Sequence, residues 1–336
     1  MNERFDTSKI EIEPETASFS ENEKRVMADA NLTPETLKEL VSGQPFAEGS
    51  YAMLFDLKPH GRDWVAKVGR GGKAETIRGA RENVTLRLLR IKGFKDAPDV
   101  HGYLAQPNVL FEEKIEGRPI DSFDERTIAD LADVLASLHS IKLDAFGKPL
   151  ENRKRGSRLD CLRRGEAILR NLAAAQEGNV EIVTLAKSML EKIALEAEQV
   201  TDAFSSSDFT LVHFDLNPGN ILRSEKDGSL VIIDWEQALV GDNAMDIAKL
   251  FLKCGFDARR REIFLQEYEL RLPGADPGFE HRLRIYEPLV LINSVLWRLR
   301  TLADPRKQGA ENEEFIRCVK SGLEVEAAKL KELATA

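Results

Sequence analysis

The chain has 336 residues, of which 42% are hydrophobic and 31% charged, and its formal net charge is -9 at pH 7. These values are typical of a globular protein with one large two-lobed unit or two domains, and they exclude bulk disorder and a fibre. The acidic balance argues against a nucleic-acid partner, because neutralising phosphates requires clustered cations.

The cysteine positions and the hydropathy of the chain indicate its cellular compartment. Cys161, Cys254 and Cys318 lie far apart and form no CxxC pair, which predicts neither a zinc site nor a disulfide framework. The segment Met1 to Glu15 is polar and acid-rich, unlike a secretion signal. The longest apolar stretch, Leu289 to Leu296, is far shorter than the roughly 20 residues that cross a bilayer. We therefore expect a cytoplasmic protein that does not bind membranes.

Two short helices are predicted near the N-terminus. Residues up to about Ser18 show little apolar periodicity, and we expect a tail there. Ser20 and Glu23 have the spacing of a capping box, which predicts the start of a helix. Thr33 followed by Pro34 combines an N-cap with proline at the first helical position, which predicts a second one.

A strand-rich segment begins at about residue 45. Strands are predicted over Ala52–Lys58 and Trp64–Val68, joined by a turn at residues 59–62 as a hairpin. A helix is predicted over Ala74–Ile91 and another strand over Val109–Ile115. The spacing predicts that the apolar face of this helix consists of Ile77, Val84, Leu88 and Ile91.

The chain then becomes largely helical. A helix is predicted over Glu125–Ile141, with Ser122 and Glu125 as its capping box. Two short strands, around Leu211–His213 and Leu230–Ile233, flank a polar loop, and helices fill most of the remainder. The inward face of the helix is predicted to hold Ile128, Leu131, Leu135 and Leu138.

The segment around these two strands carries the chemistry. It reads LVHFDLNPGNIL at 211–222 and VIIDWE at 231–236. Phosphoryl transfer needs a carboxylate that orients the attacking hydroxyl, and hard oxygen ligands for Mg²⁺. Asp215 suits the first role, and Asn220 and Asp234 suit the second. Together they match the kinase pattern of an Asp, an Asn five residues later and a strand that ends in a metal-binding Asp.

With GDNAMDIA at 241–248, this segment resembles the aminoglycoside phosphotransferase and choline kinase group of protein-kinase-like small-molecule kinases. The resemblance covers about residues 45–255. Trp235 and Glu236 follow the metal Asp where protein kinases typically have Phe and Gly, which favours a small-molecule acceptor over a protein. Phe214 stands where many relatives have Gly, a change that removes no required group.

The resemblance implies an α+β fold that is protein-kinase-like and two-lobed, with a small antiparallel β-sheet N-lobe and a larger helical C-lobe. The domains would be an N-terminal tail with short helices at 1–44, a nucleotide-binding N-lobe at 45–116, and a helical C-lobe at 117–336 with the catalytic loop and the acceptor-binding helices. It also implies a phosphotransferase with an alcohol group as acceptor, which uses Mg²⁺ and ATP or GTP as co-substrate.

The resemblance assigns an ion pair to nucleotide binding. Lys67, in the strand sequence WVAKV, resembles the lysine that contacts the nucleotide phosphates, and Glu82 on the next helix resembles its partner. Glu75 is the rival partner, although its place at the start of the helix suits an interaction with the helix dipole.

Backbone contacts to the nucleotide are expected at two further places. Gly49, Ser50 and Tyr51 occupy the position of the phosphate-covering loop. The segment FEEKIEG at 111–117 resembles the hinge whose backbone groups bind the purine, which places adenine near Glu113 and Ile115.

Two residues are expected to support the catalytic loop without exchanging protons. Asp246, in the sequence MDIA, resembles the helix-borne Asp that braces the loop through backbone hydrogen bonds. His213 is expected to orient the loop. His139, at the end of the 125–141 helix, is expected to be a packed structural histidine.

We expect the acceptor to be a hydroxylated small molecule of the aminoglycoside, sugar or amino-alcohol type. A choline-like ammonium would need an aromatic cage, for which the rings Trp235, Tyr268, Tyr286 and Trp297 exist. An anionic acceptor would suit the basic stretch 153–164, unless that stretch is a solvated face. A nucleotide-binding pseudokinase scaffold and a protein kinase are the alternative functions, and the sequence does not distinguish ATP from GTP or indicate an oligomeric state.

Overall fold

The computed structural model describes residues 19–49, 51–70, 73–176, 178–276, 278–305 and 313–335. They form two compact units. The first contains the residues up to Leu138, Lys148–Glu151 and Asn217–Ala238, and the second contains His139–Gly147, Asn152–Leu216 and the residues from Leu239 onward. The fold is the predicted kinase-like α+β fold, with an antiparallel five-stranded sheet in the first unit and long helices in the second. The three domain boundaries drawn from the sequence stay a prediction.

The five-stranded sheet of the first unit has the order β1-β2-β3-β5-β4, and all its neighbours are antiparallel. The predicted hairpin is confirmed as β2 and β3, with Lys67 opposite Leu54. Gly61, at φ 76°, ends the single turn of 3-10 helix that joins them. The strands are β1 (Ala47–Glu48), β2 (Ala52–Asp56), β3 (Trp64–Gly69), β4 (Val100–Leu104) and β5 (Val109–Glu113).

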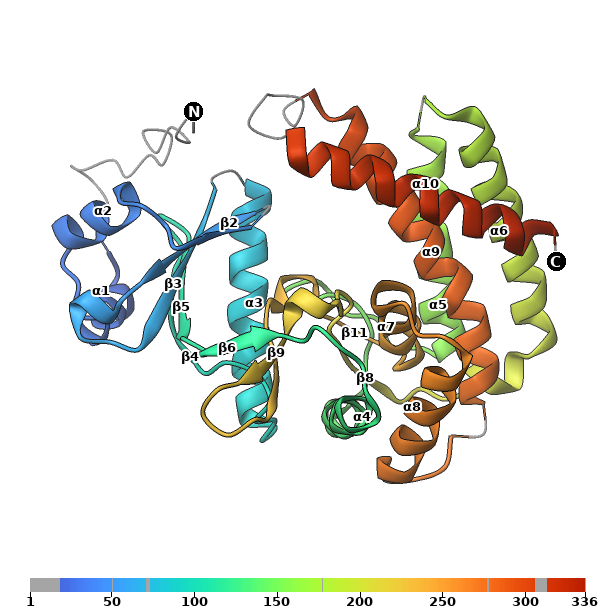
Figure 1. Cartoon of the computed structure of the whole chain (residues 1–336), viewed down its shortest axis with the longest axis horizontal. Coiled ribbons are helices and arrows are strands. Elements are labelled where there is room, and N and C mark those ends of the chain that lie inside the picture. Colours follow the sequence, from blue (N-terminus) through green and yellow to red (C-terminus); the bar gives the residue numbers. More distant parts are fainter. Residues whose placement is uncertain are drawn as a thin grey trace. The chain divides into compact units, whose positions relative to one another are not determined.

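Helices α1 (Glu21–Asp29) and α2 (Pro34–Ser42) pack on this sheet (Figure 1). Both predicted starts are confirmed, since Ser20 accepts from the backbone N–H of Glu23 and Thr33 caps α2 ahead of Pro34. Their buried apolar residues belong to the core of the sheet, so these helices are part of the first unit. This core contains Val26, Met27, Leu37, Val41, Met53, Phe55, Val68 and Phe111.

Helix α3 (Lys73–Ile91) packs against β3, β4 and β5 (Figure 1), but its predicted apolar face is wrong. Ile77 is 44% exposed and Ile91 is 80% exposed. The buried stripe instead combines polar and apolar side chains, and a search for apolar residues alone selects another face. This stripe consists of Arg81, Glu82, Thr85, Leu86 and Leu89.

A three-stranded sheet of order β10-β9-β6 completes the first unit with most of α4 (Glu125–His139). The predicted inward residues of α4 are buried. Its predicted cap is wrong, because Asp124, not Ser122, accepts from the Thr127 backbone N–H at 2.8 Å. The strands are β6 (Gly117–Pro119), β9 (Ile221–Ser224) and β10 (Leu230–Ile232).

The second unit is mainly helical and contains one small sheet of order β11-β8-β7. Helix α10 packs along α9, and α7 packs on α9 as well (Figure 1). Among the described residues, no helix combines the length and the hydropathy that crossing a bilayer requires. The elements are β7 (Lys142–Leu143), α5 (Arg158–Ala174), α6 (Val180–Gln199), β8 (Phe209–Val212), β11 (Leu239–Gly241), α7 (Ala244–Cys254), α8 (Ala258–Arg271), α9 (Phe279–Ala303) and α10 (Glu313–Thr335).

Candidate active site

A lysine on the central strand of the five-stranded sheet lies between two carboxylates. Lys67 Nζ is 2.8 Å from Glu82 Oε2 and 2.5 Å from Asp234 Oδ1. Burial alone would lower the pKa of Lys67, but the carboxylates of Asp234 and Glu82 outweigh this effect and raise that pKa well above its ordinary value. The predicted pairing of Lys67 with Glu82 is confirmed. The side chain of the rival, Glu75, lies outside the described residues.

Glu82 also connects α3 to the backbone after β10. Its Oε1 accepts from the Trp235 backbone N–H at 2.9 Å, and the Trp235 indole N–H donates to the Ile232 carbonyl at 2.8 Å. Asp234, between these two residues, has a left-handed backbone with φ 66°. Such a conformation is unfavourable for a residue with a Cβ atom. The hydrogen bonds that Trp235 donates to Glu82 and to Ile232 stabilise it, and they hold Asp234 beside Lys67.

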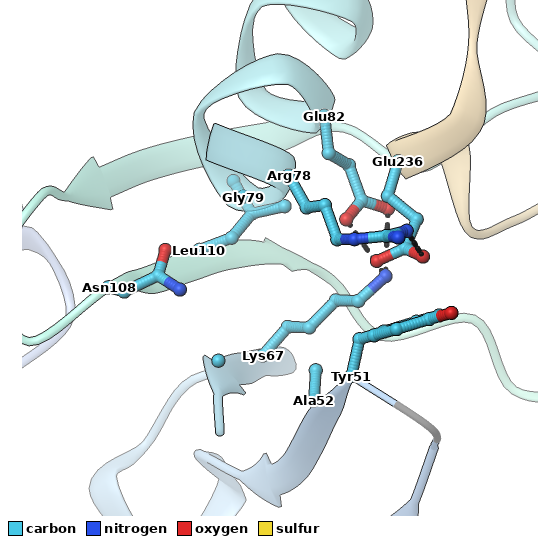
Figure 2. A pocket seen from close by; sticks show the side chains of 10 residues that line it. Tyr51, Ala52, Lys67, Arg78, Gly79, Glu82, Asn108, Leu110 and Glu236 are labelled. Carbon is cyan, nitrogen blue, oxygen red and sulfur yellow. Dashed lines mark hydrogen bonds and ion pairs between the residues drawn. The ribbon is translucent and has the colours of Figure 1, made fainter. Parts of the chain in front are cut away.

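Lys67 and Glu82 border a pocket of the first unit, which Figure 2 shows from close by. Arg78 Nη1 donates to Glu236 Oε1 at 2.9 Å, and Arg81 Nη1 donates to the Glu236 carbonyl at 3.1 Å. Burial, followed by the charge of Asp234, raises the pKa of Glu236. A pocket with this mixture of cations and carboxylates suits a ligand that carries phosphates and a divalent cation. Its lining is Tyr51, Ala52, Lys67, Gly69, Arg78, Gly79, Glu82, Asn108, Leu110 and Glu236.

The two predicted metal ligands stand on neighbouring backbone segments. Asn220 precedes β9 and Asp234 follows β10, strands that pair with Ile221 opposite Ile232. The Ile233 backbone N–H donates to the Asn220 carbonyl at 3.0 Å, which extends this pairing towards both residues. The Asp234 side chain is 36% exposed. One carboxylate and one amide oxygen, completed by phosphate oxygens and water, fit what Mg²⁺ requires.

The part of the predicted catalytic loop that belongs to the second unit is held by one buried carboxylate. Asp246 accepts from the backbone N–H groups of His213 at 2.8 Å and Phe214 at 2.7 Å. His213 Nδ1 accepts from the Asp215 backbone N–H at 3.2 Å. Asp246 and His213 are fully buried, whereas the Asp215 side chain is 37% exposed. The bracing contacts that the resemblance implied are therefore present, and they leave the Asp215 carboxylate at the surface of this unit.

His139 backs this brace from the end of α4. Its Nε2 lies 3.3 Å from Asp246 Oδ2 and its Nδ1 lies 2.8 Å from the Tyr268 hydroxyl. Asn243 Nδ2 donates to the same hydroxyl at 3.0 Å. His139 is fully buried, which confirms its reading as a packed histidine.

A lysine that the sequence did not single out lies beside Asp215. Lys249, on α7 one turn after Asp246, has its Nζ 4.0 Å from Asp215 Oδ1 and 5.6 Å from the centre of the Phe214 ring. Burial lowers the pKa of Lys249 to about 8, against the opposing effect of Asp215. Its spacing from Asp246 on one helix was the available signal, but a lysine within a helix has no motif of its own.

The other residues predicted to contact the nucleotide lie partly at this pocket and partly away from it. Tyr51 borders the pocket, the Gly49 carbonyl accepts from Arg70 Nε at 3.1 Å, and Ser50 lies outside the described residues. Glu113, at the end of β5, donates its backbone N–H to Asp99 at 2.8 Å. Neither Glu113 nor Ile115 borders the pocket around Lys67, so the place of adenine stays a prediction.

The features considered for the acceptor are largely engaged elsewhere. Of the four rings considered for an ammonium cage, Trp235, Tyr268 and Tyr286 are buried, and Trp297 is 37% exposed. Three arginines of the basic stretch form ion pairs, which leaves less of its charge for an anionic acceptor. These pairs are Arg155 with Asp144, Arg158 with Asp276, and Arg163 with Glu198.

The family model described as "Phosphotransferase enzyme family" matches residues 42–281, more than half of the chain. The chain belongs to this family. This confirms the predicted family and the predicted enzyme class. No curated protein matches the sequence of this phosphotransferase.

Solved structures share the fold of this phosphotransferase at low sequence identity. Choline kinase LicA from Streptococcus pneumoniae, which has also been solved in complex with AMP, is 20% identical with a TM-score of 0.57 over 87% of this chain and 98% of LicA. A Plasmodium vivax ethanolamine kinase is 18% identical with a TM-score of 0.60, over 92% of this chain and 90% of that one. A thermostable mutant of aminoglycoside phosphotransferase APH(4)-Ia is 16% identical with a TM-score of 0.55, over 88% of this chain and 98% of that one.

Proposed function

We propose that this phosphotransferase is a small-molecule kinase that transfers the γ-phosphate of ATP or GTP to a hydroxyl of an aminoglycoside, sugar or amino-alcohol type of acceptor. The observation that carries the proposal is the brace behind Asp215. A buried carboxylate binds two consecutive backbone N–H groups of the loop, and the side chain of Asp215 stays accessible. Choline, ethanolamine and aminoglycosides, the compounds named for the similar solved structures, all carry hydroxyl groups, which supports a hydroxyl acceptor.

In this proposal Asp215 accepts the proton of the acceptor hydroxyl. The hydroxyl oxygen forms a bond to the γ-phosphorus, the bond from that phosphorus to the bridging oxygen breaks, and the nucleoside diphosphate leaves. Lys67 contacts the nucleotide phosphates and is held by Glu82. Asn220 and Asp234 hold Mg²⁺, which when bound neutralises charge on the phosphates.

The test is release of ADP, or of GDP in parallel, by the purified protein with Mg²⁺ and a panel of acceptors. The panel contains aminoglycosides, choline, ethanolamine, sugars and hydroxylated amino acids. Asp215→Ala should lower acceptor-dependent release by about 10² to 10⁴-fold while nucleotide affinity changes little, because the carboxylate acts on the acceptor. Asp208→Ala, which alters an exposed aspartate of the same unit, is the matched control and should keep the wild-type rate.

Asp234→Ala separates the two roles, because it should also lose the Mg²⁺-dependent part of nucleotide binding. Transfer by Asp215→Ala at close to the wild-type rate would contradict the role of the base. Tight binding of Mg²⁺ and nucleotide without product from any acceptor would favour a pseudokinase scaffold. Phosphorylation of proteins in place of the panel would favour a protein kinase.

A further inference from the structure

Arg78 is a cation of the pocket that no family motif marks. It lies on α3, one helical turn before Glu82, and borders the same pocket as Lys67 (Figure 2). Its side chain is 25% exposed. Residues four apart lie on one face of a helix, so the helix that supplies the partner of Lys67 also brings a guanidinium to the pocket.

Two contacts hold the Arg78 guanidinium in place. Its Nη1 donates to Glu236 Oε1 at 2.9 Å, and Glu236 itself is buried. Its Cζ lies 3.8 Å from the centre of the Tyr51 ring, the distance of a close cation–π contact. Figure 2 shows the Tyr51 ring on one side of the guanidinium and Glu236 beside it. The guanidinium is therefore positioned before a ligand arrives, and the contact with Glu236 engages one of its five N–H donors.

Tyr51 links this cation to the segment that the sequence assigns to the phosphate-covering loop. That segment is also bound by Arg70, the residue that follows β3. The Arg70 backbone N–H donates to the Tyr51 carbonyl at 3.1 Å, and Arg70 Nε donates to the Gly49 carbonyl at 3.1 Å. Arg70 does not border the pocket, whereas Arg78 does. The two arginines therefore have different positions, since Arg70 supports the loop and Arg78 lines the pocket.

We propose that Arg78 is a phosphate-contacting residue of the nucleotide site, with Tyr51 and Glu236 as the residues that position it. This inference rests on the proposed function. The planar fork of a guanidinium matches phosphate oxygens, and Lys67 supplies only a point charge that Glu82 and Asp234 already surround. Arg78 supplies a second protein cation to a polyphosphate in this pocket.

A purely structural role makes a different prediction. If the pair of Arg78 and Glu236 only joins α3 to the backbone after β10, its loss would affect stability and would treat ligands with and without phosphates alike. A phosphate contact affects only ligands that carry phosphates. The ratio between triphosphate and nucleoside affinity therefore separates the two roles.

The experiment measures dissociation constants of ATP, GTP, adenosine and guanosine with Mg²⁺ by titration calorimetry, for the wild-type protein and three variants. Arg78→Gln should weaken triphosphate binding about tenfold or more and leave nucleoside binding within about twofold, as expected for loss of a charged hydrogen bond. Arg78→Lys keeps the charge without the planar fork and should lie between Arg78→Gln and the wild type. Arg87→Gln, which alters an exposed arginine of α3, is the matched control and should bind like the wild type.

Thermal unfolding of each variant shows whether it folds, and Arg78→Lys carries the test if Arg78→Gln does not. If the wild type binds triphosphate and both Arg78→Lys and Arg78→Gln bind it equally well, this inference is overturned while the proposed function stands. Equal weakening of nucleoside and triphosphate would overturn it too, in favour of the structural role. A wild-type protein that binds neither triphosphate would overturn the proposed function and this inference with it.

Discussion

Two lysines of this phosphotransferase with little exposed side chain have opposite electrostatic environments. Lys67, in the first unit, lies within 2.8 Å of two carboxylates, and its pKa is raised. Lys249, in the second unit, has one carboxylate at 4.0 Å, and burial lowers its pKa to about 8. Burial disfavours the charge of both, so the number and distance of the carboxylates decide the sign of the shift.

This difference suggests different tasks for the two lysines. A lysine with a raised pKa keeps its charge at any physiological pH, which suits a group that contacts phosphates. A lysine with a pKa near 8 exists in both forms close to neutral pH, and it is the group that faces the proposed base. Changes at each lysine, and at the ring that contacts the second, test the comparison from its strongest expected effect to its weakest.

Lys67→Met should have the largest effect. We expect triphosphate-dependent turnover to fall roughly a hundredfold or more, because the variant removes a fixed cation from the pocket and leaves Glu82 and Asp234 without it. Steady-state kinetics with the acceptor identified by the panel measures this. Lys253→Met, which removes a lysine paired with Glu326, is the matched control and should retain nucleotide affinity. Turnover within a few-fold of the wild type would break the comparison at its stronger end.

Lys249→Met should have an intermediate effect that depends on pH. The folded protein releases the Lys249 proton from about pH 8, whereas the unfolded chain keeps it until about pH 10.5. The unfolded state therefore binds more protons in this window. The free energy of unfolding of the wild type should consequently increase there as pH rises. The gain is on the order of 2 to 3 kcal/mol.

Urea unfolding of the wild type and Lys249→Met at pH 7.5 and pH 9.5 measures this effect. The variant should be the more stable protein at pH 7.5, where the wild type buries a charge, and its advantage should shrink at pH 9.5. An advantage that is the same at both values would show that Lys249 does not titrate in this range. The contrast with Lys67 would then be lost.

Phe214 gives the smallest expected effect. Its ring contacts Lys249, and its backbone has φ 62°, a region that favours glycine. Phe214→Gly and Phe214→Ala both remove the ring, but only the first relieves the backbone. We expect Phe214→Gly to be more stable than Phe214→Ala by about 1 kcal/mol, the reverse of the usual order, as measured by urea unfolding. The usual order would mean that the backbone hydrogen bonds donated to Asp246 do not hold this conformation in solution.

Local signals in the sequence were read correctly where the stabilising contacts are also local. The capping box at Ser20 and the N-cap at Thr33 are confirmed because each bond joins residues three apart. The face of α3 was wrong because Arg81 and Glu82 are buried by contacts with residues more than 150 positions away. Short strands such as β6 were missed for the same reason, since three residues acquire strand structure only from a distant partner.

The sequence alone determined the family, the enzyme class, the fold and the identity of the candidate groups Lys67, Asp215, Asn220 and Asp234, because ordered motifs carry these. Only the tertiary structure decided which neighbours these groups have. Arg78 came to the pocket through a helix face, and Lys249 came to Asp215 through the packing of α7 behind the loop. Burial and the distances between residues remote in sequence set the pKa values of these groups, and no spacing along the chain encodes either quantity.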